Sequence, residues 1–204
     1  MAHASWLTPS KTSGSGNDTV NFSANSQNTG RNARSTNVTF TAVGVEDVVR
    51  QINQLGKPEF AAFDNSSAAA QKTGQTLTLS GTSNSSKLLF DKANDNIGLT
   101  IPATYSVGGV ATNNGAAIAG DPGAVQQYAW SISFNIPANT GVNPLTCQII
   151  VTDDGGHTST CLITLAAGDA TLQVSSVSGD IPWDASSSVY VTVTSNTSWE
   201  IPTT

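Results

Sequence analysis

The feature that most constrains this chain is a sequence repeat at a spacing of about 111 residues. Residues 28–52 align without a gap with residues 139–163, and the tripeptide Asn-Thr-Gly opens both segments. Residues 76–87 align in the same way with residues 188–199, at a spacing of 112 residues. Self-similarity at a fixed spacing is typical of repeated structural units. The two copies are therefore expected to share one fold.

The repeated segments occur in an order that leaves the outer units incomplete. Residues 58–168 contain both kinds of segment and are expected to form a complete domain. Residues 1–57 match only the second half of that domain, and residues 169–204 match only its first half. Within the central domain, the polar and glycine-rich residues 105–124 are interpreted as an extended loop with little capacity to form core.

Apolar and polar residues alternate along these segments, which indicates β-strands with one packed face and one solvated face. Glycine, asparagine and aspartate separate the runs, and Asp153–Gly156 is typical of a hairpin turn. Only residues 67–72 have an alanine-rich composition that suits a helical turn. The predicted strands cover residues 20–24, 35–42, 45–53, 75–81, 127–136, 146–152, 158–165 and 187–194. The sequence thus predicts an all-β protein made of antiparallel β-sandwiches.

The charge distribution argues against several classes of partner. The net charge is −6, only 11% of the residues are charged, and the lysines and arginines are scattered. We therefore expect no binding to nucleic acid or to anionic membranes. No run approaches the roughly 18 apolar residues of a membrane span. The first residues lack the charged and apolar regions of a secretory signal, so we expect the chain to stay in a cytosol unless it is released with something larger.

Residues with catalytic or metal-binding chemistry are sparse. Neither histidine, His3 nor His157, neighbours a plausible nucleophile, and the sequence has no phosphate-binding loop or zinc-protease motif. The paired carboxylates lie in turn-like sequence, where aspartate usually bonds to the backbone. Residues 91–96 place oxygen ligands at alternate positions but lack the glycine and glutamate of a calcium loop. We predict no enzymatic activity, no metal and no cofactor.

The two cysteines, Cys147 and Cys161, lie on the two strands of one predicted hairpin. A three-residue turn over Asp153–Gly155 would place them directly opposite each other, which permits a cross-strand disulfide that is often strained. The alternative is a pair of small, buried thiols. The lack of a secretion signal favours the reduced form.

The motifs at the two ends of the chain resemble the BACON domain, an immunoglobulin-like β-sandwich associated with Bacteroidetes. The resemblance rests on a Ser-Asn-x-Ser-Trp corner, a Trp-Leu strand, a Ser-Gly-x-Gly turn, an Asn-Thr-Gly turn, a strand that starts near arginine and a closing glutamine. The matching residues are Ser195, Asn196, Ser198, Trp199, Trp6, Leu7, Ser13, Gly14, Gly16, Asn28, Thr29, Gly30, Arg34 and Gln54.

This chain departs from the family pattern in order, because the corner comes last and the remainder comes first. The central unit is a diverged copy, with Lys87 at the position of Trp199 and Pro144 near the place of an arginine. The resemblance implies immunoglobulin-like sandwiches. It also implies the roles proposed for BACON domains, which are binding of carbohydrate or mucin and spacing, and their occurrence in phages of gut Bacteroidetes.

A sandwich that lacks part of its strands exposes an apolar face and open strand edges. Three arrangements would explain the split unit: the ends fold together within one chain, the ends complete a neighbouring copy, or the chain is a fragment. We favour completion, and we expect Trp6, Leu7, Val189, Val191, Val193 and Trp199 to form the junction between the halves. Trp130 lies in an alternating strand, where tryptophan is usually part of a sandwich core. Trp183 lies in loop-like sequence and is expected to be the most exposed of the four tryptophans, so it is the candidate for contact with a glycan; filling of a core or an interface is the alternative.

Together with the resemblance, these observations lead us to expect a non-enzymatic structural protein of a phage virion. It would decorate the capsid, collar or tail, be assembled in the host cytoplasm, and contact other virion proteins and copies of itself. A host-surface glycan is a further candidate partner. The alternative is a carbohydrate- or mucin-binding or spacer module of a secreted Bacteroidetes protein, located outside the cell or on its surface.

Overall fold

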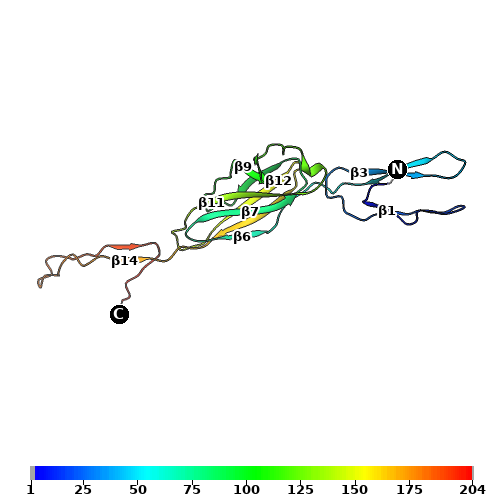
Figure 1. Cartoon of the computed structure of the whole chain (residues 1–204). Helices are drawn as coiled ribbons and strands as arrows, with labels where there is room; N and C mark the ends of the chain where they lie inside the picture. The colour runs from blue at the N-terminus through cyan, green and yellow to red at the C-terminus, as the bar shows by residue number, and fades with distance from the viewer. Residues whose placement is uncertain (1–2, 204) are drawn as a thin grey trace.

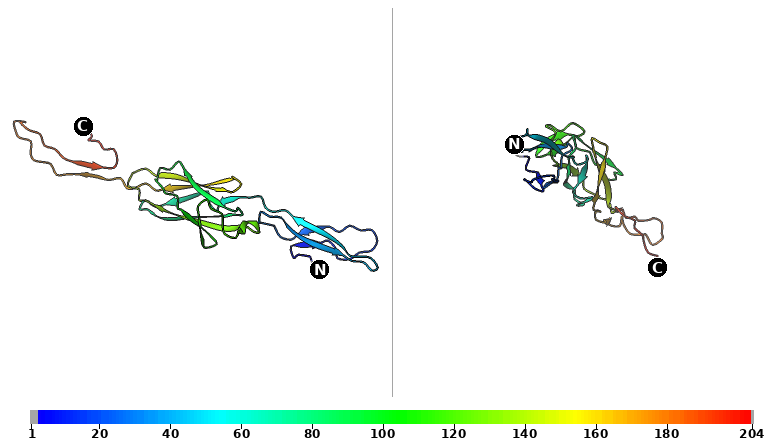
Figure 2. Two further views of the ribbon diagram at one scale, coloured as in Figure 1. Left: turned by 90° about the horizontal axis from the view of Figure 1, so that it is seen from above. Right: turned by 90° about the vertical axis from the view of Figure 1, so that its right-hand side faces the viewer.

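A computed structural model describes residues 3–203 and shows an elongated, all-β molecule. A central two-sheet sandwich separates a smaller N-terminal part from a C-terminal hairpin, and the two ends of the chain lie on opposite sides of the sandwich (Figures 1 and 2). The one helical element among the described residues is a 3₁₀ turn, Pro122–Ala124. The predicted fold class is confirmed: the chain is all-β and its sheets are built mainly from antiparallel pairs.

The central sandwich has a five-stranded sheet in the order β10-β9-β11-β7-β5 and a four-stranded sheet in the order β6-β13-β12-β8. All its pairings are antiparallel except the parallel pair β6–β13. The strands are β5 (Ala61–Phe63), β6 (Ser67–Ala70), β7 (Gln75–Ser83), β8 (Leu88–Ala93), β9 (Thr104–Val107), β10 (Val110–Asn113), β11 (Tyr128–Ile136), β12 (Leu145–Asp153) and β13 (Thr158–Leu165).

One apolar core lies between these two sheets. It arises because the alternating apolar residues of each long strand point to the same side, as in Trp130, Ile132 and Phe134 of β11. The side chain of Trp130 is 2% exposed and packs edge-on against the rings of Phe63 and Phe90, at 5.1 Å between centroids in each case. The predicted placement of Trp130 in the core is confirmed.

The described residues of the outer parts form only two-stranded sheets. In the N-terminal part, β1 (Leu7–Pro9) pairs with β2 (Phe22–Ala24), and β3 (Arg34–Phe40) pairs with β4 (Val48–Gln54). The C-terminal part is a single hairpin of β14 (Leu172–Val174) and β15 (Val193–Ser195). Two-stranded sheets have marginal stability by themselves, so these parts differ in kind from the central sandwich.

Two local predictions in the central domain were wrong. Residues 67–70 form strand β6 and not a helical turn, because Ala68 and Ala70 alternate toward the core beside β13. The segment 105–124 contains most of β9 and all of β10, and it contributes Tyr105, Val107 and Ile118 to the core. Its large apolar residues are few, but Tyr105 and Val107 lie on strand β9 of the five-stranded sheet and are buried in the core, a tertiary effect that composition does not reveal.

The predicted register of the β12–β13 hairpin was also wrong. The turn residues are Asp154–Gly156, flanked by Asp153 and His157, whose backbones are hydrogen-bonded at 3.0 Å. Cys147 therefore lies opposite Ile163, and Cys161 lies opposite Ile149. Both cysteines are free and buried, and burial raises the pKa of the Cys147 thiol to about 12. The pKa of Cys161 is raised by the same cause.

Gly81 of β7 provides a test of how closely the strands and the core side chains of the five-stranded sheet are packed. A Cβ at this position would lie 2.1 Å from the carbonyl oxygen of Ala62 and 2.2 Å from Cζ2 of Trp130. We expect Gly81→Ala to lower the free energy of unfolding by about 1–3 kcal/mol or more, because neither the strand β5 backbone nor the buried ring can move freely. Urea denaturation followed by tryptophan fluorescence measures the change.

The matched control is Gly179→Ala in the C-terminal hairpin, where an added Cβ meets no atom within 4 Å. We expect the free energy of unfolding of this control to stay within about 0.5 kcal/mol of that of the parent protein. A Gly81→Ala protein as stable as the control would show that the β5 backbone and the Trp130 ring do not lie this close to Gly81.

Candidate functional site

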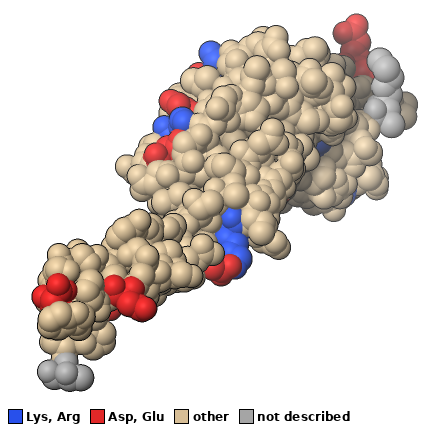
Figure 3. Space-filling model, turned by 90° about the vertical axis from the view of Figure 1, so that its left-hand side faces the viewer, with Lys and Arg blue, Asp and Glu red and all other residues tan. Residues whose placement is uncertain are grey.

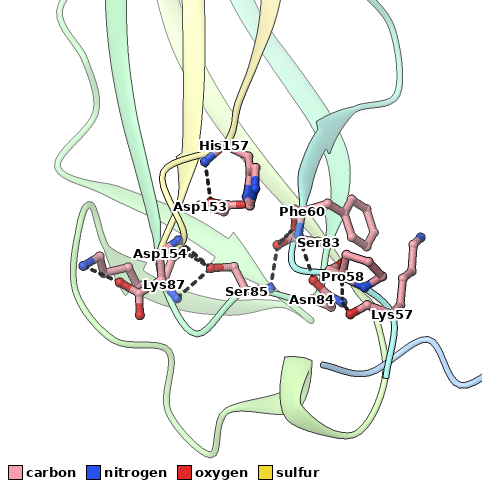
Figure 4. A network of polar contacts seen from close by, with 10 residues as sticks. All are labelled: Lys57, Pro58, Phe60, Ser83, Asn84, Ser85, Lys87, Asp153, Asp154 and His157. Carbon is pink, nitrogen blue, oxygen red and sulfur yellow. Dashed lines mark hydrogen bonds and ion pairs between the residues drawn. The ribbon is translucent and has the colours of Figure 1, made fainter. Parts of the chain in front are cut away.

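The best-developed polar site is the joint between the N-terminal part and the central sandwich, and its centre is the side chain of Asn84. Asn84 follows β7 and is fully buried (Figure 4). Its Oδ1 accepts a hydrogen bond from the backbone N–H of Phe60 at 3.0 Å. Its Nδ2 donates to the carbonyl oxygens of Lys57 at 3.1 Å, Pro58 at 3.2 Å and Thr29 at 3.4 Å. One amide thus connects the linker, the preceding turn and the sandwich.

The side chain of Arg31 also connects the N-terminal part to the central sandwich at this joint. The guanidinium of Arg31 makes a two-pronged ion pair with Asp121, at 2.6 and 3.0 Å, and also donates to the carbonyl oxygen of Asn84 at 2.7 Å. The Asp121 carboxylate raises the pKa of Arg31, so the charge is retained. Bidentate arginine–carboxylate pairs fix orientation as well as distance. The N-terminal part is therefore held at a defined angle.

The Asn-Thr-Gly turn makes the close approach possible. The backbone N–H groups of Arg31 and Asn32 donate to the carbonyl oxygens of Gly123 and Ala124, at 2.9 and 3.0 Å. A Cβ on Gly30 would lie 2.3 Å from the carbonyl carbon of Val125. Only glycine allows this approach between two backbones, which gives Gly30 a physical role at this joint.

The same joint occurs a second time, between the central sandwich and the C-terminal hairpin. Asn196 follows β15 as Asn84 follows β7. Its Oδ1 accepts from the N–H of Thr171 at 2.8 Å, and its Nδ2 donates to the carbonyl oxygens of Asp169 at 2.8 Å and Thr140 at 3.0 Å. Thr171, Asp169 and Thr140 each lie 111 positions after Phe60, Pro58 and Thr29. The repeat in the sequence is thus a repeat of hydrogen bonds.

Further bonds of the two joints coincide in the same way. Asn28 donates through Nδ2 to the carbonyl oxygens of Asn32 and Leu55, and Asn139 donates to those of Asn143 and Ala166. The serine before each corner asparagine donates to the matching carbonyl oxygen, Ser83 to Phe60 at 2.7 Å and Ser195 to Thr171 at 2.8 Å. The second joint has valine at position 142, where the first has Arg31, so it lacks the ion pair.

The strands of the outer parts also repeat the pairing of the central sandwich. Leu172 lies opposite Ser195 in the C-terminal hairpin, as Ala61 lies opposite Ser83 in β5–β7. Arg34 lies opposite Gln54 in β3–β4, as Leu145 lies opposite Leu165 in β12–β13. The C-terminal part therefore has the geometry of the first half of a sandwich, and the N-terminal part has that of its second half. The division at residues 57 and 169 remains a prediction in its exact bounds.

Both halves present apolar surface that has no cover among the described residues. The exposed large apolar side chains of the N-terminal part are Phe40, Val43, Val45, Val48, Val49 and Leu55. Those of the C-terminal part are Leu172, Val174, Val177, Ile181, Trp183, Tyr190, Val191, Trp199 and Ile201. A cavity of about 470 Å³ lies in the N-terminal part, with Val20, Phe22, Val38 and Phe40 in its lining.

The residues predicted to join the two halves lie at opposite ends of the molecule (Figure 1). Leu7 is buried, Trp6 is half-buried under the guanidinium of Arg34 at 4.9 Å, and Val189 and Val193 are half-buried. Val191 is 41% exposed and Trp199 is 51% exposed. The structure therefore does not bring these six residues together within one chain, and the folding of the two ends onto each other is not seen.

The position of Trp199 in the repeat is clearer in three dimensions than in the sequence. Lys87, its counterpart in the ungapped alignment, forms a surface ion pair with Asp154 at 2.6 Å, whereas the next residue, Leu88, is fully buried. A gap of one residue in the corner places Trp199 on Leu88 and Ile201 on the buried Phe90. Trp199 thus occupies a position that is core in the complete domain.

The remaining candidate groups serve local structure. Asp153 accepts hydrogen bonds from the backbone N–H of His157 at 2.7 Å and contacts its Nδ1 at 2.9 Å. Asp95 accepts from the N–H groups of Ile97, Gly98 and Leu99. Burial acts to raise the pKa of Asp95, but the ion pair with Lys92 and the N–H bond from Gly98 lower it below the ordinary value. Among residues 3–203, no three His, Cys, Asp or Glu side chains gather as a metal site requires.

Trp183 is 99% exposed, so the prediction that it is the most exposed of the four tryptophans is confirmed. It lies in the segment between the two strands of the C-terminal hairpin. Sequence reasoning missed the joint, although it had aligned Asn84 with Asn196. The pair Arg31–Asp121 gave no signal in the sequence, because the two residues lie 90 positions apart.

Residues 1–55 match the model of the BACON family, described as "Putative binding domain, N-terminal". The resemblance to BACON domains is thereby confirmed over this part of the chain. No curated protein matches the sequence. A solved structure of an endo-fucoidan hydrolase from glycoside hydrolase family 107 matches with 15% identity and a TM-score of 0.29, and the match covers 83% of this chain and 23% of the enzyme. Within residues 3–203, no helix has the length and apolarity needed to cross a bilayer.

The two corner asparagines form a matched pair for testing the joint. We expect Asn84→Ala to lower the free energy of unfolding by about 1–3 kcal/mol, because it leaves the backbone N–H of Phe60 and three carbonyl oxygens short of a partner in a buried site. Asn196→Ala removes equivalent bonds at an exposed site, and we expect a change of no more than about 0.5 kcal/mol. Chemical denaturation of the two variants measures both values, and equal losses would contradict the buried role of Asn84.

Proposed function

We propose that this protein is a non-catalytic structural module that holds β-sandwich domains in a fixed, end-to-end row, as a spacer or a carrier of binding surfaces. The observation that carries the proposal is the repeated joint. An asparagine, a serine and an Asn-Thr-Gly turn at equivalent positions make equivalent hydrogen bonds in the joint before the central sandwich and in the joint after it. A connection that only tethered two domains would not need a buried amide with four partners.

The chemistry of the joint supports rigidity over flexibility. Interdomain linkers that allow motion are exposed and rich in polar residues or glycine. Here the linker carbonyls of Lys57 and Pro58 are bound by Asn84, and Arg31 crosses to Asp121 on the adjoining domain. Bending the joint would break several of these bonds together. Polar side chains with catalytic chemistry, such as Asp153 and His157, are hydrogen-bonded to each other in a turn.

A second candidate function is binding of a glycan through Trp183. A fully exposed tryptophan is uncommon on a protein surface, and its flat, apolar face can stack on a sugar ring. The BACON description as a putative binding domain is compatible with this role. In this arrangement, the row of sandwiches would carry Trp183 away from the point of attachment, outside the cell or at its surface.

The finer assignment as a decoration protein of a phage capsid, collar or tail rests on the resemblance to BACON domains found in phages. The family description names a binding domain and no virion component, so this assignment and its virion partners stay predictions. They are tested by detecting the protein in purified virions by mass spectrometry. The spacer role does not depend on the outcome.

Rigidity of the joint is measured by the distance between spin labels on the exposed residues Asn53 and Asn135, one on each side of it. We expect a narrow distance distribution in the parent protein and a broad one in Arg31→Ala, because the variant loses the ion pair to Asp121 and the bond to Asn84. The control is Arg50→Ala, since the Arg50 guanidinium bonds only the carbonyl oxygen of its neighbour Val49. A broad distribution in the parent protein would overturn the spacer proposal.

The glycan role is tested on an array of host and mucin glycans. We expect Trp183→Ala to lose at least about tenfold in affinity for any glycan bound, which corresponds to roughly 1.4 kcal/mol. Trp183→Phe retains an aromatic face and should keep most of the binding. Absence of binding by the parent protein, or equal binding by Trp183→Ala, would remove this candidate.

A further inference from the structure

We propose that the C-terminal part of one copy of this chain, residues 172–201, completes the N-terminal half-domain of a second copy, so that copies join head to tail. The proposal deepens the proposed function, since it names a second copy as the partner that continues the row of sandwiches. It rests on the open strand edges, the shape of the N-terminal cavity, the apolar side chains on both halves, and their charges.

Among the described residues, the half-domain at each end contains the strands that the half-domain at the other end does not have. In the central sandwich, β11 has β9 on one side and β7 on the other, and β12 has β13 on one side and β8 on the other. By the repeat, β2 and β3 correspond to β11 and β12. Among the described residues each has a single neighbour, β1 and β4 respectively. The counterparts of the missing β7 and β8 are residues 187–195 and 199–204, at the C-terminal end.

The central sandwich also defines the register of the joined halves. In β7–β11, Leu79 lies opposite Ile132 and Leu77 opposite Phe134. A shift of 112 residues converts these pairs into Val191 opposite Val20 and Val189 opposite Phe22. All four residues are apolar, and the intervening pair, Tyr190 and Asn21, is exposed on both strands. Its counterpart, Thr78 with Ser133, makes a side-chain hydrogen bond of 2.8 Å on the outer face.

The cavity of the N-terminal part lies where the second copy would enter. Its apolar lining residues Val20, Phe22, Val38 and Phe40 correspond to Ile132, Phe134, Ile149 and Val151, which are all at most 1% exposed in the complete sandwich. In the half-domain, Phe40 is 41% exposed. The volume of about 470 Å³ suits several side chains of the entering strand. Val189, Val191 and Val193 have the spacing to occupy it.

The charges of the two halves are complementary. Residues 1–57 contain five basic and three acidic side chains, whereas residues 170–204 contain three acidic side chains and no basic one. Figure 3 shows acidic groups on the hairpin at the C-terminal end. Complementary potentials favour encounter between unlike surfaces and oppose pairing of like ones. Head-to-tail contact is therefore favoured over contact of two hairpins.

The geometry excludes completion within the chain as it is folded here, because the two halves lie at opposite ends of the sandwich (Figure 2). A contact between unlike surfaces of identical chains repeats, and it generates a filament or a closed ring. Each added copy contributes one donor segment and one open half-domain. The central sandwich is complete in every copy and is unaffected.

A disulfide between copies tests the register. The carbonyl oxygen of Asn21 accepts from the N–H of Ser10, and the N–H of Asn21 donates to Oγ of Ser10, so the Asn21 backbone faces β1. Asn21 and Tyr190 are then a non-hydrogen-bonded pair, with Cα atoms about 4.5 Å apart, within the range of about 4.4–6.8 Å for a disulfide. We expect Asn21→Cys chains mixed with Tyr190→Cys chains to form cross-linked dimers under mild oxidation, at least tenfold more than either variant alone.

The matched control mixes Asn21→Cys with Thr194→Cys, also an exposed position of the hairpin strand but four residues out of register, about 13 Å away. We expect little cross-linking in this mixture. The native thiols do not interfere, because Cys147 and Cys161 are buried and burial raises the pKa of each. Equal cross-linking with Tyr190→Cys and Thr194→Cys would overturn the proposed register.

A chain with both Asn21→Cys and Tyr190→Cys distinguishes a cross-link between two copies from a cross-link within one chain. We expect a ladder of linked multimers on a non-reducing gel, and light scattering of the parent protein should show a mass that increases with concentration. A cross-linked monomer, or no cross-link in any mixture, would overturn the proposal. Neither result tests the proposed spacer function, which is measured separately by the distance across the joint within a single chain.

Discussion

A β-sheet with one apolar face requires a second sheet to cover that face, and the rest of this structure follows from whether the requirement is met. In the central domain it is met, and Trp130 lies under Phe63 and Phe90 with almost no exposure. In the outer parts it is met only in part. The side chains that correspond to the central core, such as Phe40 and Val191, remain about two-fifths exposed. The outer parts differ from the central domain in the number of strands that cover the apolar face. They do not differ in the alternation of apolar and polar residues.

Polar groups at the ends of the sandwich determine how domains are placed in a row. Burial of a polar group is costly unless it is hydrogen-bonded, and the buried Asn84 has a partner for each of its polar atoms. The joint is thus specific because no other orientation would satisfy the same atoms. Asn196 makes the equivalent bonds while exposed, because the described residues contain only the first half of the domain beyond this joint. Arg31 and Asp121 add a directional constraint to the first joint alone.

The sequence was sufficient for the fold class, the long strands and the repeat, because alternation over nine residues, as in β7 and β11, leaves little freedom in which face is buried. It was insufficient where short strands depend on neighbours. Ala68 and Ala70 have weak strand preference and pair only because β13 lies beside them. The hairpin register depended on whether the turn began at Asp153 or Asp154, a choice made by the hydrogen bonds between Asp153 and His157. The ion pair of Arg31 with Asp121 joins different domains and has no local signal.

The marginal stability of the outer parts has a consequence for assembly. A two-stranded sheet gains little from its own hydrogen bonds, so part of the ordering of residues 172–201 would occur only on contact with a second copy. Such coupled ordering lowers the affinity gained per unit of buried area. The completed domain would compensate through a core like that of the central sandwich, in which Ile132, Ile149 and Leu88 are buried. Association of this kind forms and breaks as a folding event, and dissociation is accordingly slow, because it requires the strands of a whole sandwich to separate together.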